Sequence, residues 1–291
     1  MDTRQAEYAL AVADELSFTR AAWRVHAVQS TVSAGVRALE TELGVTLFER
    51  DQRGVRVTTA GEAVLPVLRE FVGLGDRART AADSQGALRG QLRVGVFSSV
   101  SYLAVPRAIG AFRAAHPHVE LRLRSAPSGS GELAHAVRQG RLDVSLFGLP
   151  APAASGLSVH RLVTSPYSVL LPPDHRLSGR TEIRLQDLDG EAFVDSPPGF
   201  GNRDVLDTAL RSRGFVRDVA VEVTETAAIP AFIGNGLGVG LLPEVLVPTG
   251  MDVETVTLAE RIEWDFNVVT RRMPPPAASA LLEHLFAAYR D

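Results

Sequence analysis

The stretch Ser17-Phe18-Thr19-Arg20-Ala21-Ala22, followed after a short turn by Gln29–Leu43, decides the fold of the first sixty residues. Ser17 is a typical helix N-cap, and the small side chains of Ala21 and Ala22 allow a second helix to cross closely. Apolar residues recur every three or four positions along Gln29–Leu43, and Gly44 follows, so this segment predicts a helix with one buried face. Together the two segments predict a helix-turn-helix unit.

A further helix and a small β-hairpin are expected on either side of this unit. Asp2 with Gln5 three residues later is a typical helix start. Downstream, apolar and polar residues alternate around Gly54, which predicts a two-stranded wing. Glu49 and Asp51 leave open the alternative of a solvated charged hairpin. The arginines that flank the wing and could reach DNA phosphates are Arg50, Arg53 and Arg56.

The segment after the wing is expected to form a long linker helix. Thr59 and Glu62 have the pattern of a capping box, with Thr59 as N-cap. Apolar residues then follow at spacings of four and three, the period of a coiled-coil seam, although an amphipathic helix packed on its own core is the alternative. Pro66 should kink this helix, and Ser84–Gly90 is the expected hinge. The predicted seam consists of Ala60, Val64, Val67, Phe71, Leu74, Ala78 and Ala81.

Strands and helices alternate from Gln91 to the end of the chain. This alternation predicts a largely parallel sheet with helices on both faces. Ligands of such sheets bind beyond the C-terminal ends of the strands, where helix N-termini offer free N–H groups. The candidate ligand contacts at those ends are Ser98, Ser99, Val100, Ser128, Phe147, Ser196, Phe200, Gly201, Asn202 and Thr226.

The chemistry of these candidates suits an anionic ligand. Hydroxyl groups and helix N-termini favour negative charge, while Phe147 and Phe200 could cover an apolar body. Glu225, if it lies inside the site, would instead favour an amine or a hydroxyl group. The alternative is that the serines are only helix caps and turn residues.

The composition limits what the chain can be. It has 291 residues, 45% hydrophobic and 22% charged, as expected for a folded protein of two or three domains. Cysteine is absent, which excludes disulfides and thiolate chemistry, and all 30 basic residues are arginine. No apolar run is long enough to span a membrane, and no export signal is recognisable, so we expect a cytoplasmic protein. Because the net charge is −4, any contact with DNA must come from locally placed residues and not from an overall positive charge.

The N-terminal pattern resembles that of the LysR-type transcriptional regulators. The match rests on Ser17–Ala22, Gln29, Val32-Ser33, Leu39-Glu40, Leu43-Gly44, Leu47-Phe48-Glu49-Arg50 and Thr58-Thr59-Ala60-Gly61, in order and at the same spacing. The resemblance implies a winged helix-turn-helix whose third helix enters the major groove, with a linker helix that dimerises. By the same resemblance, DNA is contacted by Gln29, Ser30, Thr31, Ser33 and Arg37 and its backbone is gripped by Arg50 and Arg53.

Several positions depart from that pattern. Val28 stands where the family usually has a serine cap, and Ser30 replaces a frequent proline. Ala34 and Gly35 fall where many members carry longer side chains. Gly35 within a helix costs about 1 kcal/mol relative to alanine. Base readout is therefore expected to depend on Gln29, Ser33 and Arg37.

The C-terminal part resembles the LysR-type effector-binding domain, which shares the two-lobed fold of periplasmic solute-binding proteins. Supporting pieces are Leu92–Gly95, Leu103–Pro106, Phe112–Pro117, Gly140–Asp143 and Gly236–Pro243. The resemblance implies a ligand cleft between the lobes, lined by Ser99, Val100, Ser128 and the Phe200 region in members that respond to carboxylated metabolites.

The predicted architecture is therefore α/β with three parts. Residues 1–59 form an all-α winged helix-turn-helix, 60–90 a linker helix and hinge, and 91–291 the effector domain. Lobe one would hold about 91–162 and 266–291, and lobe two about 163–265.

The predicted function is a transcriptional regulator switched by a small effector, with a carboxylate favoured. Its expected partners are promoter DNA with an imperfect inverted repeat, RNA polymerase, and other copies of the chain as a dimer or tetramer. No catalytic residue, metal or cofactor is expected. The alternatives are an enzyme and a solute-binding receptor. The sequence has neither a Gly-x-Ser-x-Gly elbow nor a dinucleotide-type glycine turn, which argues against an enzyme.

Overall fold

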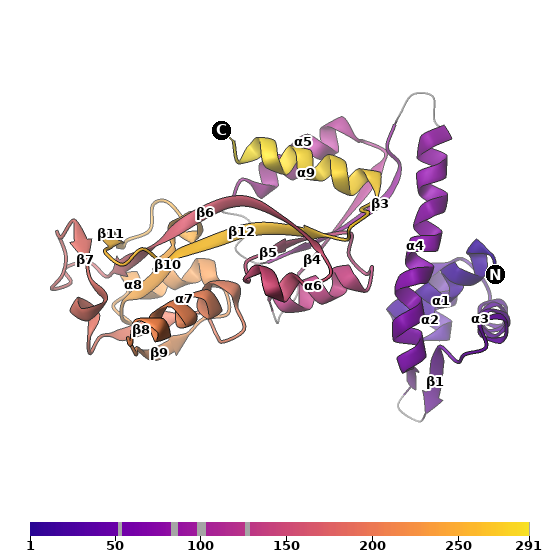
Figure 1. Ribbon diagram of the computed structural model, residues 1–291, viewed down its shortest axis with the longest axis horizontal. Helices are drawn as coiled ribbons and strands as arrows, with labels where there is room; N and C mark the ends of the chain where they lie inside the picture. The colour runs from indigo at the N-terminus through magenta and orange to yellow at the C-terminus, as the bar shows by residue number, and fades with distance from the viewer. Residues whose placement is uncertain (52–53, 83–86, 98–102, 126–128, 291) are drawn as a thin grey trace.

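The computed structural model describes residues 1–51, 54–82, 87–97, 103–125 and 129–290 (Figure 1). Five predicted site residues lie outside these ranges: Arg53, Ser98, Ser99, Val100 and Ser128.

The N-terminal module has the predicted helices and wing. The Asp2–Gln5 capping box starts α1, and Ser17 Oγ accepts a hydrogen bond from the Arg20 N–H at the start of α2. Gly44 ends α3 with a φ of 70°, a left-handed conformation that glycine adopts without strain. The elements are α1 (Thr3–Glu15), α2 (Phe18–Arg24), α3 (Gln29–Leu43), β1 (Phe48–Asp51) and β2 (Gly54–Val57), the last two paired antiparallel.

Gly35 is unfavourable in a helix by propensity, but it has a role in the packing of α3. A Cβ atom at Gly35 would lie 2.6 Å from Cδ2 of Tyr8, so the ring of Tyr8 occupies the space of a side chain. The absence of a side chain thus lets α1 and α3 approach closely around the buried core of Ala6, Val12 and Val36.

The linker helix α4 (Thr59–Ala82) begins one residue differently from the prediction. Its capping side chain is Thr58, whose Oγ1 accepts from the Gly61 N–H at 2.9 Å, so the predicted Thr59 cap is wrong. The helix continues through Pro66. One face packs on the N-terminal module through Leu65 and Leu68, as in the alternative interpretation of the periodicity. Val67 and Leu74 of the predicted seam are 61% and 54% exposed.

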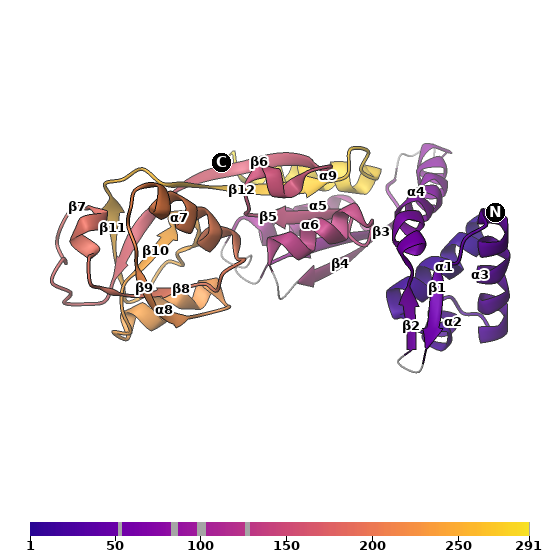
Figure 2. The ribbon, with the colours of Figure 1, turned by 60° about the horizontal axis from the view of Figure 1, so that its bottom comes forward.

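The C-terminal part is two-lobed, and two long strands run through both lobes (Figures 1 and 2). These strands are β6 (Ser158–Leu171) and β12 (Glu263–Thr270), which pair antiparallel. The predicted lobe limits at 162/163 and 265/266 therefore fall inside continuous strands. Lobe one adds β3 (Gly90–Val96), β4 (Val119–Ser125), β5 (Val144–Phe147), α5 (Val105–Ala115), α6 (Ser130–Arg138), η2 (Ala151–Ala154) and α9 (Pro276–Ala288).

Lobe two is built on the other ends of β6 and β12. One cluster of its core is formed by Leu170, Val194, Ile229, Ile233 and Leu242, and its other buried residues join the main core, which continues from lobe one. Its elements are β7 (Glu182–Ile183), η3 (Leu185–Leu188), β8 (Ala192–Asp195), α7 (Gly201–Ser212), β9 (Asp218–Glu222), η4 (Thr226–Ala228), α8 (Ile229–Gly234), β10 (Gly240–Pro243), η5 (Glu244–Leu246) and β11 (Glu254–Leu258).

The sheet is mixed, so the expectation of a largely parallel sheet is wrong. The strand order is β4-β3-β5-β12-β6-β11-β7, with β10 also paired to β6. Parallel pairs occur at β3–β4, β3–β5 and β7–β11, but β12 and β6 run antiparallel to their neighbours. Local alternation of strands and helices cannot reveal this, because β6 and β12 cross between lobes and meet partners far away in the sequence.

Candidate nucleic-acid interface and ligand site

The start of α3 presents polar side chains to solvent. Gln29, Ser30 and Thr31 are exposed in its first turn, and Arg37 is exposed two turns further on. The first turn carries no acidic residue. A helix end of this composition can lie against the negatively charged edge of a major groove.

Ser33 does not lie on that exposed surface, contrary to the sequence prediction. Its residue is only 4% exposed, and its Oγ accepts hydrogen bonds from Nη2 of Arg37 and Nη2 of Arg50, each at 3.2 Å. The helical wheel alone placed Ser33 outward, whereas in the structure the side chain of Arg50, from β1 of the wing, reaches its hydroxyl. Ser33 therefore holds two arginines.

The side chain of Arg50 is held in place by contacts within the N-terminal module itself. Its guanidinium carbon lies 3.8 Å from the centre of the Phe18 ring, a cation–π contact, while Nη2 reaches Ser33. Phe18 in turn packs edge-on against Phe48. Arg56 is exposed on β2, opposite Glu49 in the hairpin register. The wing arginines thus differ: Arg50 is fixed by α2 and α3, and Arg56 lies at the surface.

A cavity of about 330 Å³ lies between the lobes, a size that suits a small metabolite. The N-termini of α6 and α7 both line this cavity. A Cβ atom at Gly201 would lie 2.5 Å from the Gly148 carbonyl oxygen, so only glycine permits this close approach of α7 to the end of β5. Among the described residues no side chain caps either helix start. The described lining residues are Phe97, Ser125, Gly129, Ser130, Gly148, Phe200, Gly201, Asn202, Thr224, Glu225, Thr226, Leu246 and Trp264.

The structure brings some predicted ligand contacts together and separates others. Phe200, Gly201, Asn202 and Thr226 line the cavity. The prediction for Phe147 is wrong: its ring is fully buried in the core beneath α6, because consecutive strand residues point to opposite faces of the sheet.

Ser196 lies one layer behind the cavity wall. Its Oγ accepts from the Asn202 side-chain amide at 3.1 Å and bonds the Thr226 hydroxyl at 3.0 Å. Tyr167 donates its hydroxyl to the Asn202 carbonyl oxygen. Burial raises the pKa of Tyr167 well above its ordinary value, so this hydroxyl stays a donor. Ser196 therefore orients two wall residues instead of touching the ligand space.

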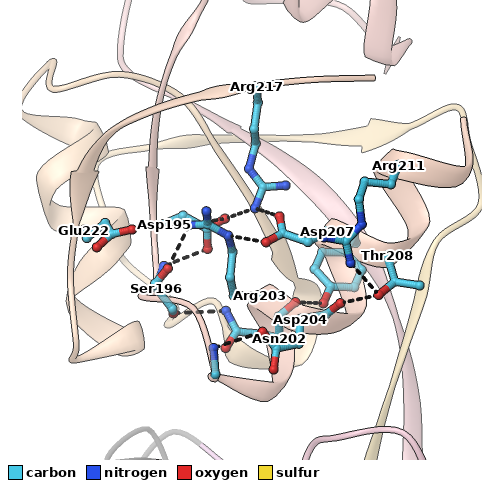
Figure 3. A network of polar contacts seen from close by, with 12 residues as sticks. Asp195, Ser196, Asn202, Arg203, Asp204, Asp207, Thr208, Arg211, Arg217 and Glu222 are labelled. Atoms are coloured by element: carbon cyan, nitrogen blue, oxygen red, sulfur yellow. Dashed lines mark hydrogen bonds and ion pairs between the residues drawn. The ribbon is translucent and has the colours of Figure 1, made fainter. Parts of the chain in front are cut away.

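Behind Ser196, an ion-pair network ties α7 to β8 (Figure 3). The Asp195 carboxylate contacts Arg217 and accepts from the Ser196 N–H at 2.7 Å. Arg203 donates to the Ser196 carbonyl oxygen at 3.0 Å and to Asp207 at 2.8 Å. Burial raises the pKa of Asp195 to about 6, although the nearby arginines act in the opposite direction. This network fixes the backbone of Asp195 and Ser196 and the start of α7, which carries the wall of the cavity.

Sequence reasoning missed several lining residues. Trp264 comes from β12 and donates its indole N–H to the Gly148 carbonyl oxygen at 2.7 Å. Leu246 and Phe97 contribute apolar surface. Leu246 follows β10 by three residues and Trp264 is the second residue of β12, but both are apolar, and the sequence prediction of ligand contacts concentrated on hydroxyl groups and helix starts. Ser130, by contrast, could have been found as the first residue of α6.

Neither a metal cluster nor a membrane-spanning helix occurs in the described ranges. Within them, no group of three histidine, aspartate or glutamate side chains is placed to hold a metal ion. The described helices include none that is long and apolar enough to cross a membrane.

Known families match both parts of the chain. Residues 3–62 match the bacterial regulatory helix-turn-helix proteins of the lysR family, and residues 85–290 match the LysR substrate binding domain. These matched ranges cover the winged module and the two-lobed part described above.

Characterised relatives and solved structures agree with these matches. The RuBisCO operon transcriptional regulator of Allochromatium vinosum is 31% identical over 98% of this chain and 95% of its own length. The HTH-type transcriptional regulator ShiR of Corynebacterium glutamicum (strain R) is 33% identical over 83% of this chain and 82% of its own. A full-length variant of OxyR from Pseudomonas aeruginosa superposes with a TM-score of 0.82 at 26% identity, covering 100% of this chain and 95% of that one. The chain therefore belongs to the LysR family of transcriptional regulators.

Proposed function

We propose that this regulator responds to a small carboxylate that also carries a hydrogen-bond donor, bound in the interlobe cavity. One observation carries this proposal: the uncapped N-termini of α6 and α7 and the Glu225 side chain line the same 330 Å³ space. Helix N-termini favour a negative group, whereas the Glu225 carboxylate favours an amine or hydroxyl. The rings of Phe97, Phe200 and Trp264 would cover the carbon skeleton.

Binding of such a ligand is tested by thermal shift with a panel of small hydroxy and amino acids and their primary amides. The amide keeps the shape of each acid and removes its charge. We expect the acids to raise the melting temperature of the full chain and the amides to leave it unchanged. Equal stabilisation by an acid and its amide contradicts the anion subsite.

The donor subsite is tested with Glu225→Gln. This variant should lose its preference for ligands that carry an amine or hydroxyl, while Glu182→Gln, an exposed acid on β7, serves as the matched control. If Glu225→Gln keeps the preference of the parent protein, the ligand does not reach Glu225.

On the DNA side, we propose that Gln29, Ser30, Thr31 and Arg37 face the major groove and that Arg50, Arg53 and Arg56 contact the backbone. Ser33 is proposed to act through Arg37 and Arg50. A dimer through α4 would place two modules on the halves of an inverted repeat, with RNA polymerase as a further partner. Gel shift on the DNA upstream of its own reading frame tests this proposal; the absence of any preferred sequence contradicts it.

We further infer that the chain acts by binding and not by catalysis, in the cytoplasm where promoter DNA is found. Among the described residues that line the interlobe cavity, no histidine stands beside a serine, as nucleophilic catalysis would require. Ligand turnover in a purified sample, followed by mass spectrometry, would contradict this inference.

A further inference from the structure

A second cavity, of about 430 Å³, lies where the N-terminal module, the linker helix and lobe one meet. Its walls come from α1 and α2, from the middle of α4, from β3 and from the start of α9. Figures 1 and 2 both show α4 beside this end of lobe one. The cavity is separate from the interlobe site, since the two share no described lining residue.

The charged groups around this cavity are unbalanced. Of the described lining residues, five are arginines and three are acids. The arginines are Arg24, Arg69, Arg89, Arg93 and Arg271, and the acids are Glu7, Asp14 and Asp143.

Two of the three acids, Asp14 and Asp143, are already engaged by some of these arginines. Asp143 receives Nε of Arg93 at 3.0 Å and Nη2 of Arg93 at 2.8 Å, so both of its oxygens are used. Asp14 contacts both Arg69 and, at 3.0 Å, Arg24. These pairs leave a surplus of positive charge in the cavity.

Arg271 carries that surplus. Its ionic contact runs from Nη2 to Asp143 at 3.7 Å, beyond hydrogen-bond distance. Its Nε and Nη1 are buried without a hydrogen-bond partner in the part of the chain that the structure describes. Leaving a buried charge without hydrogen bonds is costly, and Arg271 also lines the cavity, so an anion bound there would offset the charge of its guanidinium and stabilise the protein.

A second arginine and a helix end lie beside Arg271. A Cβ atom at Gly140 would come within 2.9 Å of both Nη1 of Arg271 and Cδ of Arg69, so both side chains lie against the same glycine. Desolvation and the neighbouring arginines lower the pKa of Arg69 despite its partner Asp14. Pro275, Pro276 and Ala277, at the start of the 13-residue helix α9, also line the cavity.

We propose that this cavity binds a compact oxyanion of the phosphate class, free or as the phosphoryl group of a small metabolite. Arginine guanidinium groups pair well with phosphate, and the positive end of the α9 dipole adds further attraction. Cations from β3, α4 and the segment before α9 surround the space, which suits the three terminal oxygens of a phosphoryl group better than the two of a carboxylate. Because the walls belong to the DNA-binding module, the linker and lobe one, the bound anion holds these parts in one arrangement.

The test uses the full-length protein with inorganic phosphate, glycerol 3-phosphate or pyrophosphate, against chloride at matched ionic strength. We expect at least one phosphate compound to raise the melting temperature by about 3–6 °C at ten times its Kd. A larger effect of glycerol 3-phosphate identifies a metabolite-borne group, and a larger effect of inorganic phosphate identifies the free ion. Greater stabilisation by citrate than by every phosphate compound overturns the ligand class.

Location is tested with Arg271→Gln and the matched control Arg272→Gln, an exposed neighbour outside the cavity. Arg271→Gln should weaken phosphate binding tenfold or more, and Arg272→Gln should bind like the parent protein. Arg24→Gln, at the end of α2, provides a second variant if Arg271→Gln does not fold. Hydrogen exchange should show anion-dependent protection in α4 and at the start of α9. Equal binding by all variants, or protection confined to the interlobe cavity, overturns the proposal.

Discussion

The guanidinium of Arg69 donates from Nη1 to the carbonyl oxygen of Gln139 at 3.0 Å, and this bond joins the linker helix to lobe one. Gln139 is the C-cap of α6, and Ser130 at the other end of α6 lines the interlobe cavity. The Arg69 side chain is only 5% exposed and also contacts Asp14 of α1. A single helix therefore connects the interlobe cavity with the junction of the DNA-binding module.

Arg69→Met should uncouple ligand binding from DNA binding. It removes the bond to Gln139 but leaves Asp14 with Arg24 as a partner. Ligand affinity should be unchanged, while the ligand-induced change in DNA affinity, ordinarily about 5–150-fold for allosteric coupling, should fall toward one. Parallel calorimetry and DNA titrations measure both, with exposed Arg161→Met as control. Retention of the full ligand effect on DNA would exclude this route.

Gln29→Ala and Ser33→Ala should have different consequences. Gln29 is exposed at the start of α3, so its loss should relax base preference at one position by about 1–3 kcal/mol without affecting folding. Loss of the buried Ser33 hydroxyl frees Arg37 and Arg50, which should weaken binding to all sequences and lower the unfolding free energy by about 1 kcal/mol. Competition gel shifts and chemical denaturation separate the two; Gln186→Ala, exposed in lobe two, is the control. A sequence-selective defect in Ser33→Ala would restore it as a base contact.

Leu74→Asp should dissociate the dimer that the α4 periodicity predicts. Leu74 and Val67 are exposed seven residues apart on one face of α4, away from Leu65 and Leu68. A charge at Leu74 therefore destabilises a coiled-coil contact between two α4 helices without disturbing the core of the N-terminal module. A charge at Phe71 would not separate the two effects, because Phe71 also packs against that core. Sedimentation velocity should show a smaller oligomer for Leu74→Asp and the parental one for Val216→Asp. An unchanged oligomer would place the interface elsewhere.

Asp195 should make stability depend on pH. Burial raises its folded pKa to about 6, above the ordinary value of 3.8, so the folded state holds this proton more tightly than the unfolded state. The associated stability is present below pH 4 and is lost as pH rises to about 6, by up to about 3 kcal/mol. Denaturation at several pH values should show the parent losing stability over this range relative to Asp195→Asn. Asp218→Asn, exposed on β9, should follow the parent; a constant difference between parent and Asp195→Asn would refute the shift.

The elements that could be predicted are those fixed by neighbours in the chain. The Asp2–Gln5 box, the Ser17 cap and the limits of α3 follow from local hydrogen bonding and from helical spacing, and the structure confirms them. Four of the described ligand candidates line the interlobe cavity because strand ends and helix starts are also local features. Ser33 was misplaced because a spacing pattern does not say what a distant residue such as Arg50 will contact. Phe147 was misplaced because the alternation of side chains along β5 turns it into the core beneath α6.

By itself, the sequence determined the family, the winged module, the linker helix and the two-lobed α/β class, since these depend on periodicity, capping and motif order. Only the tertiary structure decided how β6 and β12 cross both lobes, how Trp264 reaches Gly148, and how Arg69 and Arg271 converge on Gly140. Those relationships join residues that are far apart along the chain. They arise from the packing of complete helices and strands, and short-range sequence patterns carry no information about that packing.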